Sequence, residues 1–137
     1  MDYAKLALEL SEQMQLLHKA KAHKKDGFHG EEFVLHYIAE HGGEVVPSDI
    51  GKEMDVSSAR IAQTLNSIEK KGFVTREIDV GDRRRVIVKL TAKGEDEDKR
   101  HFEEIMEHMT KMLMSLGEYD AKEYVRITKK LAKNFLK

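Results

Sequence analysis

Three consecutive arginines, Arg83, Arg84 and Arg85, follow Asp82 in a short stretch that also contains Gly81. A guanidinium group is always charged near neutral pH, and it binds carboxylates and phosphates through paired hydrogen bonds. Crowding three such cations together is unfavourable unless an anion receives them. The stretch therefore predicts a turn, opened by the glycine, whose side chains bind an anion.

Positive charge is concentrated in one part of the chain. Residues 57–93 contain nine Lys and Arg against four Asp and Glu, a net charge of +5, whereas the whole chain has a formal net charge of −1. The rest of the chain is therefore acidic. A basic patch on an acidic protein is the pattern expected of a phosphate-binding surface.

A helix predicted over 58–71 adds side chains that could read bases. Ser57 is its expected N-cap and Gly72 its expected C-terminal stop. At about 100° per residue, an apolar stripe and a polar face lie on opposite sides. The stripe contains Ile61, Leu65 and Ile68; the polar face contains Ala59, Arg60, Gln63 and Ser67, with Lys70 at its end. Arginine can bond guanine and glutamine adenine in a bidentate way, with serine more permissive. An ordinary solvated helix face explains the same residues equally well.

Short elements on both sides of this helix complete a pattern. A short helix should begin at Pro47 and pack Ile50 and Met54 against the apolar stripe. Residues 73–78 and 86–91 alternate with a period of two, which predicts a hairpin with the arginines at its tip. A short segment at 45–46 could add a third strand. Two helices joined by a tight turn and followed by such a hairpin favour insertion into DNA.

The chain resembles the multiple-antibiotic-resistance regulator (MarR) family of winged-helix bacterial transcription factors. The residues that carry the resemblance are Ile68, Glu69, Gly72, Val74 and Arg76, then Asp82, Arg84, Leu90, Thr91 and Gly94. The resemblance implies that Arg84 enters the DNA minor groove while Asp82 holds it in place. Arg83 and Arg85 would then meet phosphates.

The expected DNA contacts divide into two groups. Arg60, Gln63 and Ser67 would read the major groove. Other hydroxyl side chains are expected on the phosphate side, namely Ser48, Ser57, Ser58 and Thr64. Ser48 is also the expected cap of the short helix that begins at Pro47.

Long helices flank the winged region. Helices are predicted from Tyr3 to about residue 24, over 30–40, from a cap at Thr91 to residue 116, and from Tyr119 or Asp120 onward. The predicted fold is mainly α (α+β): a single domain, 1–137, with dimerisation helices at about 1–25 and 95–137 and a DNA-binding lobe at about 30–94. The flanking helices carry apolar stripes that one domain of this size could not bury alone. A homodimer on a pseudopalindromic operator is therefore expected.

The resemblance also implies an effector, a small aromatic or lipid-like molecule bound between the dimerisation helices and the lobe. The expected lining residues are Leu17, Phe28, Phe33, Tyr37, Phe102 and Met106. Each of them, taken alone, is better explained as a plain core residue. Repression relieved by such a ligand would be a population shift between dimers with different spacing of their lobes.

Three alternatives to a DNA-binding repressor are less well supported by the sequence. The family has a zinc-responsive branch, but only Glu32 and His101 coincide with the ligand positions of that branch. The seven histidines are therefore better explained as solvated side chains, and no metal site is predicted. A winged helix used only for protein contacts is disfavoured, because it has no need for so much unpaired charge at the wing. An enzyme is rejected, since no nucleophile, glycine-rich phosphate loop or orienting third group accompanies His101 and Glu104.

The composition excludes further classes of site. With no cysteine, the chain has no disulfide, no cysteine-ligated zinc and no thiol nucleophile. No apolar run approaches the length of a membrane span, and the first residues do not read as a signal peptide. A cytoplasmic protein with no membrane contact and no cofactor is expected.

Overall fold

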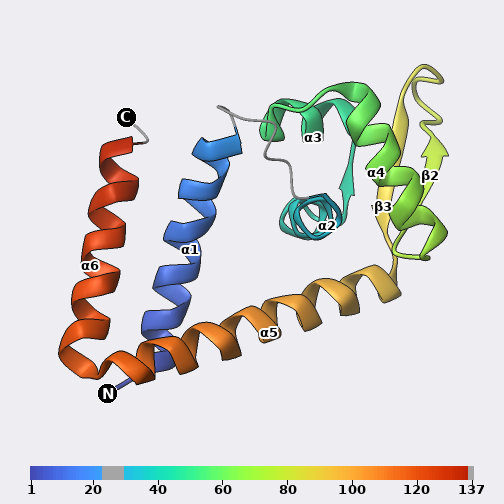
Figure 1. Ribbon diagram of the computed structural model, residues 1–137. Coiled ribbons are helices and arrows are strands. Elements are labelled where there is room, and N and C mark those ends of the chain that lie inside the picture. Colours follow the sequence, from blue (N-terminus) through green and yellow to red (C-terminus); the bar gives the residue numbers. More distant parts are fainter. Residues whose placement is uncertain (23–29, 136–137) are drawn as a thin grey trace. The chain divides into compact units, whose positions relative to one another are not determined.

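The computed structural model describes residues 1–22 and 30–135, which fold into helices and one small sheet (Figure 1). The helices are α1 (Tyr3–Ala22), α2 (Glu31–Glu40), α3 (Pro47–Met54), α4 (Ser58–Lys70), α5 (Ala92–Leu116) and α6 (Glu118–Phe135); the strands are β1 (Glu44–Val45), β2 (Val74–Ile78) and β3 (Val86–Leu90). This order confirms the predicted, mainly helical winged helix–turn–helix with its flanking helices. None of the described helices is long and apolar enough to cross a membrane.

The chain divides into two compact units. A helical unit contains α1 and the chain from Phe102 onward, and a winged-helix unit contains α2 to β3 and the start of α5 as far as His101. The division thus falls inside α5, whereas the sequence placed the border near residue 94. Whether 1–137 behaves as a single domain stays a prediction.

The sheet of the winged-helix unit is antiparallel, with the strand order β1-β3-β2. The β2–β3 register pairs Val74 with Leu90 and Ile78 with Val86, and β1 joins through Val45 opposite Val88. The period of two places Val74 and Val88 on the face that packs into the core, where both are buried. The hairpin is therefore anchored at its base and extends away from the core toward its tip.

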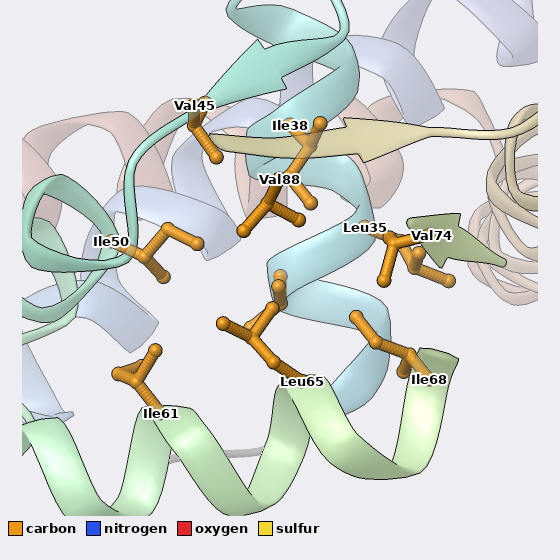
Figure 2. Packing of buried hydrophobic residues seen from close by; sticks show 10 residues of the cluster. Leu35, Ile38, Val45, Ile50, Ile61, Leu65, Ile68, Val74 and Val88 are labelled. Atoms are coloured by element: carbon orange, nitrogen blue, oxygen red, sulfur yellow. The ribbon is translucent and has the colours of Figure 1, made fainter. Parts of the chain in front are cut away.

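The core of the winged-helix unit confirms the predicted apolar stripe. Figure 2 shows Ile61, Leu65 and Ile68 projecting from α4 toward side chains of α2, α3 and the sheet. Those partners include Leu35, Ile38, Ile50, Val74 and Val88, all of them buried, with Met54 at the edge. Burial of this stripe turns the opposite face of α4 outward.

At the N-terminal ends of α3 and α4, one predicted helix cap is confirmed and one is wrong. Ser57 caps α4 as predicted, because its Oγ accepts a hydrogen bond from the Arg60 backbone N–H at 3.2 Å. The expected cap at Ser48 was wrong: Val46 is the N-cap of α3 and makes no side-chain cap bond. Proline has a fixed φ and no N–H, so it is suited to the first helical position, and Pro47 places Ser48 inside the first turn.

The Leu-Thr-x-x-Gly run joins the start of α5 to the turn between α4 and β2. The Thr91 backbone N–H donates to the Phe73 carbonyl at 3.0 Å, and Thr91 Oγ1 donates to the Gly72 carbonyl at 2.6 Å. The same Oγ1 accepts from the Gly94 N–H at 3.0 Å. A Cβ on Gly94 would lie 2.0 Å from the Phe73 carbonyl oxygen, so only glycine fits. Gly72 has a φ of 83°, as expected of a helix stop.

The helical unit is built on the contact between α1 and α6. Small and medium side chains lie at its centre, and the buried set is Ala7, Leu10, Leu113, Ala121 and Val125. An ion pair between Glu9 and Lys129, at 3.3 Å, crosses the same two helices. On a flank of α6, Ile127, Leu131 and Phe135 recur every four residues and are exposed within this chain.

Candidate nucleic-acid interface

The loop between β2 and β3 is organised by two aspartates. Backbone hydrogen bonds close two successive turns, from the Asp82 N–H to the Asp79 carbonyl (3.3 Å) and from the Arg85 N–H to the Asp82 carbonyl (2.9 Å). Asp79 Oδ1 also accepts from the Gly81 N–H at 2.9 Å, and Asp82 Oδ1 from the Arg84 N–H at 3.1 Å. Gly81 does not take a left-handed conformation, so the turns come from the aspartates and not from glycine, contrary to expectation.

Asp82 holds the side chain of Arg84. Arg84 Nε donates to Asp82 Oδ1 at 3.1 Å and Nη2 lies 3.4 Å from Oδ2, while the Arg84 side chain remains 91% exposed. The side-chain and then the backbone hydrogen bonds from Arg84 lower the pKa of Asp82. The carboxylate is therefore ionised at neutral pH and presents the guanidinium outward in one orientation.

The wing, which is the hairpin of β2 and β3 with the loop 79–85 between them, carries less unpaired charge than the sequence suggested. Besides the Arg84 pair, Arg85 Nη1 lies 3.8 Å from Asp79 Oδ2. Arg83 is exposed and has no ion-pair partner in the described part of the chain. The loop is nevertheless cationic, because three arginines outnumber two aspartates.

The predicted DNA-contacting residues of α3 and α4 differ in exposure and in their hydrogen bonds. Ser57, Ser58 and Gln63 are exposed, as is Ser48 on α3, and Arg60 is half-buried. Thr64 Oγ1 donates to the Arg60 carbonyl at 3.1 Å, which ties this hydroxyl to its own helix.

Ser67 is engaged by another helix. Its Oγ donates to Glu31 Oε2 on α2 at 3.2 Å, and Lys71 Nζ lies 2.6 Å from Glu31 Oε1. Glu31 thus holds the C-terminal part of α4 against α2. The role of Ser67 in base reading stays a prediction, and such a role would require this hydroxyl to change partner.

Arg76 forms a bridge from the wing to α4 that sequence reasoning missed. Its Nε and Nη2 donate to Glu69 Oε1 at 3.1 and 2.7 Å, and Nη2 also donates to Asn66 Oδ1 at 2.6 Å. The side-chain hydrogen bond from Arg76 lowers the pKa of Glu69. Glu69 and Arg76 stood out in the motif, but only the folded chain brings them together. The bridge therefore joins strand β2 to α4.

A cluster of ionisable groups lies where α2 meets the first turns of α5. Burial, followed by the neighbouring carboxyl of Glu97, raises the pKa of Glu32 to about 7. His101 Nδ1 lies 3.9 Å from Glu32 Oε2, a buried oxygen without a hydrogen-bond partner. Nearby, His36 Nδ1 lies 3.1 Å from Asp98 Oδ1. No three His, Asp or Glu side chains of the described residues are placed to hold a metal ion.

The residues expected to line an effector site belong to both units. Phe33 and Tyr37 are half-buried on α2, and Tyr37 stacks on His41 with 4.0 Å between ring centroids. Leu17, Phe102 and Met106 belong to the helical unit. Phe28 lies outside the described residues. An effector site built from these side chains stays a prediction.

Comparison with known proteins settles the family. A sequence model described as MarR family matches residues 33–85, which run from α2 to the arginines of the wing. YwhA of Bacillus subtilis (strain 168), an HTH-type transcriptional regulator, is 30% identical over 100 residues, which cover 73% of this chain and 71% of YwhA. The chain belongs to the MarR family. The resemblance that its motif residues suggested is thus confirmed.

Two further relatives extend the comparison of this MarR-family chain. YcgE, another HTH-type regulator of B. subtilis (strain 168), is 33% identical over 88 residues, or 63% of this chain and 54% of YcgE, so the match spans about half the length of that relative. The crystal structure of Streptococcus pneumoniae FabT in complex with DNA superposes with a TM-score of 0.61 at 26% identity. It covers 77% of this chain and 71% of FabT.

Proposed function

We propose that this MarR-family protein is a sequence-specific transcriptional regulator that binds double-stranded DNA as a homodimer and acts as a repressor. The observation that carries the proposal is a preorganised cationic wing beside the outward polar face of α4. In this arrangement α4 enters the major groove with Arg60 and Gln63, and Arg84 enters the minor groove. Relatives named as transcriptional regulators, and FabT bound to DNA, support it.

The Asp82–Arg84 pair suits this role because it fixes a cation without hiding it. An unrestrained arginine loses rotamer freedom when it enters a groove, and a pre-positioned one loses less. The negative potential of a narrow minor groove attracts such a guanidinium. Arg83, with no ion-pair partner in the described chain, would face a phosphate.

The homodimer is supported by the exposed apolar stripe of α6, formed by Ile127, Leu131 and Phe135. A two-fold dimer presents two α4 helices to two half-sites about one helical turn apart, which requires a pseudopalindromic operator. A small aromatic or lipid-like effector that changes the spacing of the lobes would relieve repression. The proposal assigns no catalytic step to the protein.

The proposal is tested by the salt dependence of binding to a fluorescently labelled duplex of random sequence. Phosphate contacts release counterions, so the logarithm of the affinity should fall linearly with the logarithm of the salt concentration. A protein whose wing makes only protein contacts would show no such fall. No binding to the duplex at any salt concentration would overturn the proposal.

A further inference from the structure

The wing exposes aliphatic side chains that the core does not use. Val80 is 98% exposed, Ile78 63% and Val86 38%. Ile78 and Val86 are register partners across the two strands, so their side chains lie on the same face of the hairpin. Nearer the base, the same face carries buried Val74 and Val88. Arg76 lies on this face between Val74 and Ile78 and is bonded to Glu69 and Asn66 of α4; beyond it, Ile78 and Val86 form an exposed apolar pair.

Water alone does not favour these residue types at these positions. Beyond the end of the core both faces of a hairpin meet water, and turn tips are dominated by Gly, Pro, Asn, Asp and Ser. Here Val80 occupies the second position of the turn closed by the Asp82 N–H and the Asp79 carbonyl. The loop is held by its own hydrogen bonds, so it presents a β-branched aliphatic side chain in a fixed place.

The surroundings of this aliphatic set restrict its partner. Three arginines follow Val80 within five residues and draw in phosphates. A partner that places apolar surface between rows of phosphates matches both features. The minor groove of DNA does so, because its walls are the C–H faces of deoxyriboses, and minor-groove proteins commonly combine arginine with apolar side chains.

We propose that Val80, supported by Ile78 and Val86, packs against the deoxyribose walls of the minor groove when Arg84 enters it. The inference rests on the proposed DNA-binding function and assigns the wing a second, apolar contact. This contact depends on groove width and not on base identity, so the wing would read DNA shape as well as charge.

Val80→Ala tests the contact without disturbing the fold, because the side chain is almost fully exposed. On the duplex that the protein enriches from a randomised pool, the variant should bind about tenfold more weakly per wing at every salt concentration, since it loses two methyl groups of buried apolar surface. The slope of log affinity against log salt should not change. Ile78→Thr, which keeps the β-branched shape, should act in the same direction.

Arg83→Gln is the matched control in the same loop. It removes a charge and no aliphatic surface, so it should reduce the salt slope by about 0.9 per wing for the lost phosphate contact. Hydroxyl-radical cleavage, which attacks sugars in the minor groove, supplies an independent readout. Wild-type protein should protect the sugars beneath the wing, and Val80→Ala should restore their cleavage.

The possible results separate the inference from the function beneath it. Wild-type binding with an unchanged affinity and footprint for Val80→Ala would overturn the apolar contact and leave DNA binding intact. A change in sedimentation of Val80→Ala without DNA would also overturn it, because the aliphatic set would then contact a second copy of this chain. Absence of DNA binding by the wild type would overturn both.

Discussion

Arg84 and Arg60 are expected to have different roles in DNA binding, because different contacts position their side chains. Arg84 is oriented by two bonds to Asp82, whereas Arg60 lies half-buried on α4, a helix placed by its own apolar stripe. A guanidinium in the minor groove, which carries little sequence information, contributes to affinity on any DNA. A guanidinium in the major groove contributes only on sequences that place its preferred base opposite it.

Arg84→Ala and Arg60→Ala should therefore differ in kind. We expect Arg84→Ala to weaken binding on all duplexes and to reduce the salt slope. Arg60→Ala should cost about 1–3 kcal/mol on the preferred sequence and relax the preference at one base pair. Competition binding against duplexes with single base-pair changes measures both. An equal loss of affinity for both variants on every sequence would contradict the division.

The carboxyl of Glu32 is expected to give the fold a pH dependence. Its pKa is raised from an ordinary 4.5 to about 7, chiefly by burial. The folded state favours the protonated carboxyl of Glu32. The contribution of this group to the free energy of unfolding is therefore fully present below about pH 4.5 and is lost as the pH rises through about 7. Glu32→Gln imitates the protonated carboxyl. Its melting temperature should exceed that of the wild type by more at pH 8 than at pH 5, and an equal difference at both pH values would contradict the assignment.

Among the elements, the wing is attached at two points that lie far apart in the sequence. Arg76 ties β2 to Glu69 and Asn66 of α4, and Thr91 ties the end of β3 to the turn after α4. Gly94 allows α5 to start against the Phe73 carbonyl. These contacts join the hairpin to α4 within the winged-helix unit.

Gly94→Ala should show how tight this junction is. The added methyl group would overlap backbone and not a movable side chain, so we expect a loss of stability of about 1–3 kcal/mol, or more. Gly81→Ala is the matched control. It adds a Cβ 3.5 Å from Asp79 Oδ1 at a position without a left-handed φ, so its effect should stay within about 0.5 kcal/mol. Chemical denaturation measures both, and similar losses for the two variants would contradict the account.

Sequence patterns predicted the elements well where periodicity and local chemistry decide them. The strands at 74–78 and 86–90, the stripe on α4 and the Ser57 cap all lie where the residues placed them. Local reasoning failed at Ser48, which lies inside the first turn of a helix that begins at Pro47 and so cannot cap it, and at Gly81, where aspartates make the turn.

Most of the contacts that sequence reasoning missed join distant parts of the chain. Glu31 with Ser67 and Lys71, and Glu32 with His101, are separated by more than thirty residues, so no local periodicity reports them. Glu69 and Arg76 are close in sequence, but a helix end, a turn and a strand lie between them. Their pairing follows from the geometry of that turn.

For the whole molecule, the helical unit predicts association. The α6 stripe of Ile127, Leu131 and Phe135 is exposed in the single chain, and burying it against a second copy is favourable. We expect sedimentation analysis to show a dimer at micromolar concentration. Leu131→Glu should shift the protein toward monomer, whereas Lys130→Glu on the neighbouring exposed position should not. A monomeric wild type would contradict the proposed dimer.

The account as a whole is tested most directly by selection of duplexes from a randomised pool, with the protein at physiological salt. Two α4 helices related by a two-fold axis should enrich a pseudopalindrome with half-sites about one helical turn apart. Arg84→Ala should enrich the same base preferences in the major groove with weaker recovery. Recovery of unenriched sequence, with binding that is weak and salt-sensitive throughout, would contradict a sequence-specific dimeric regulator.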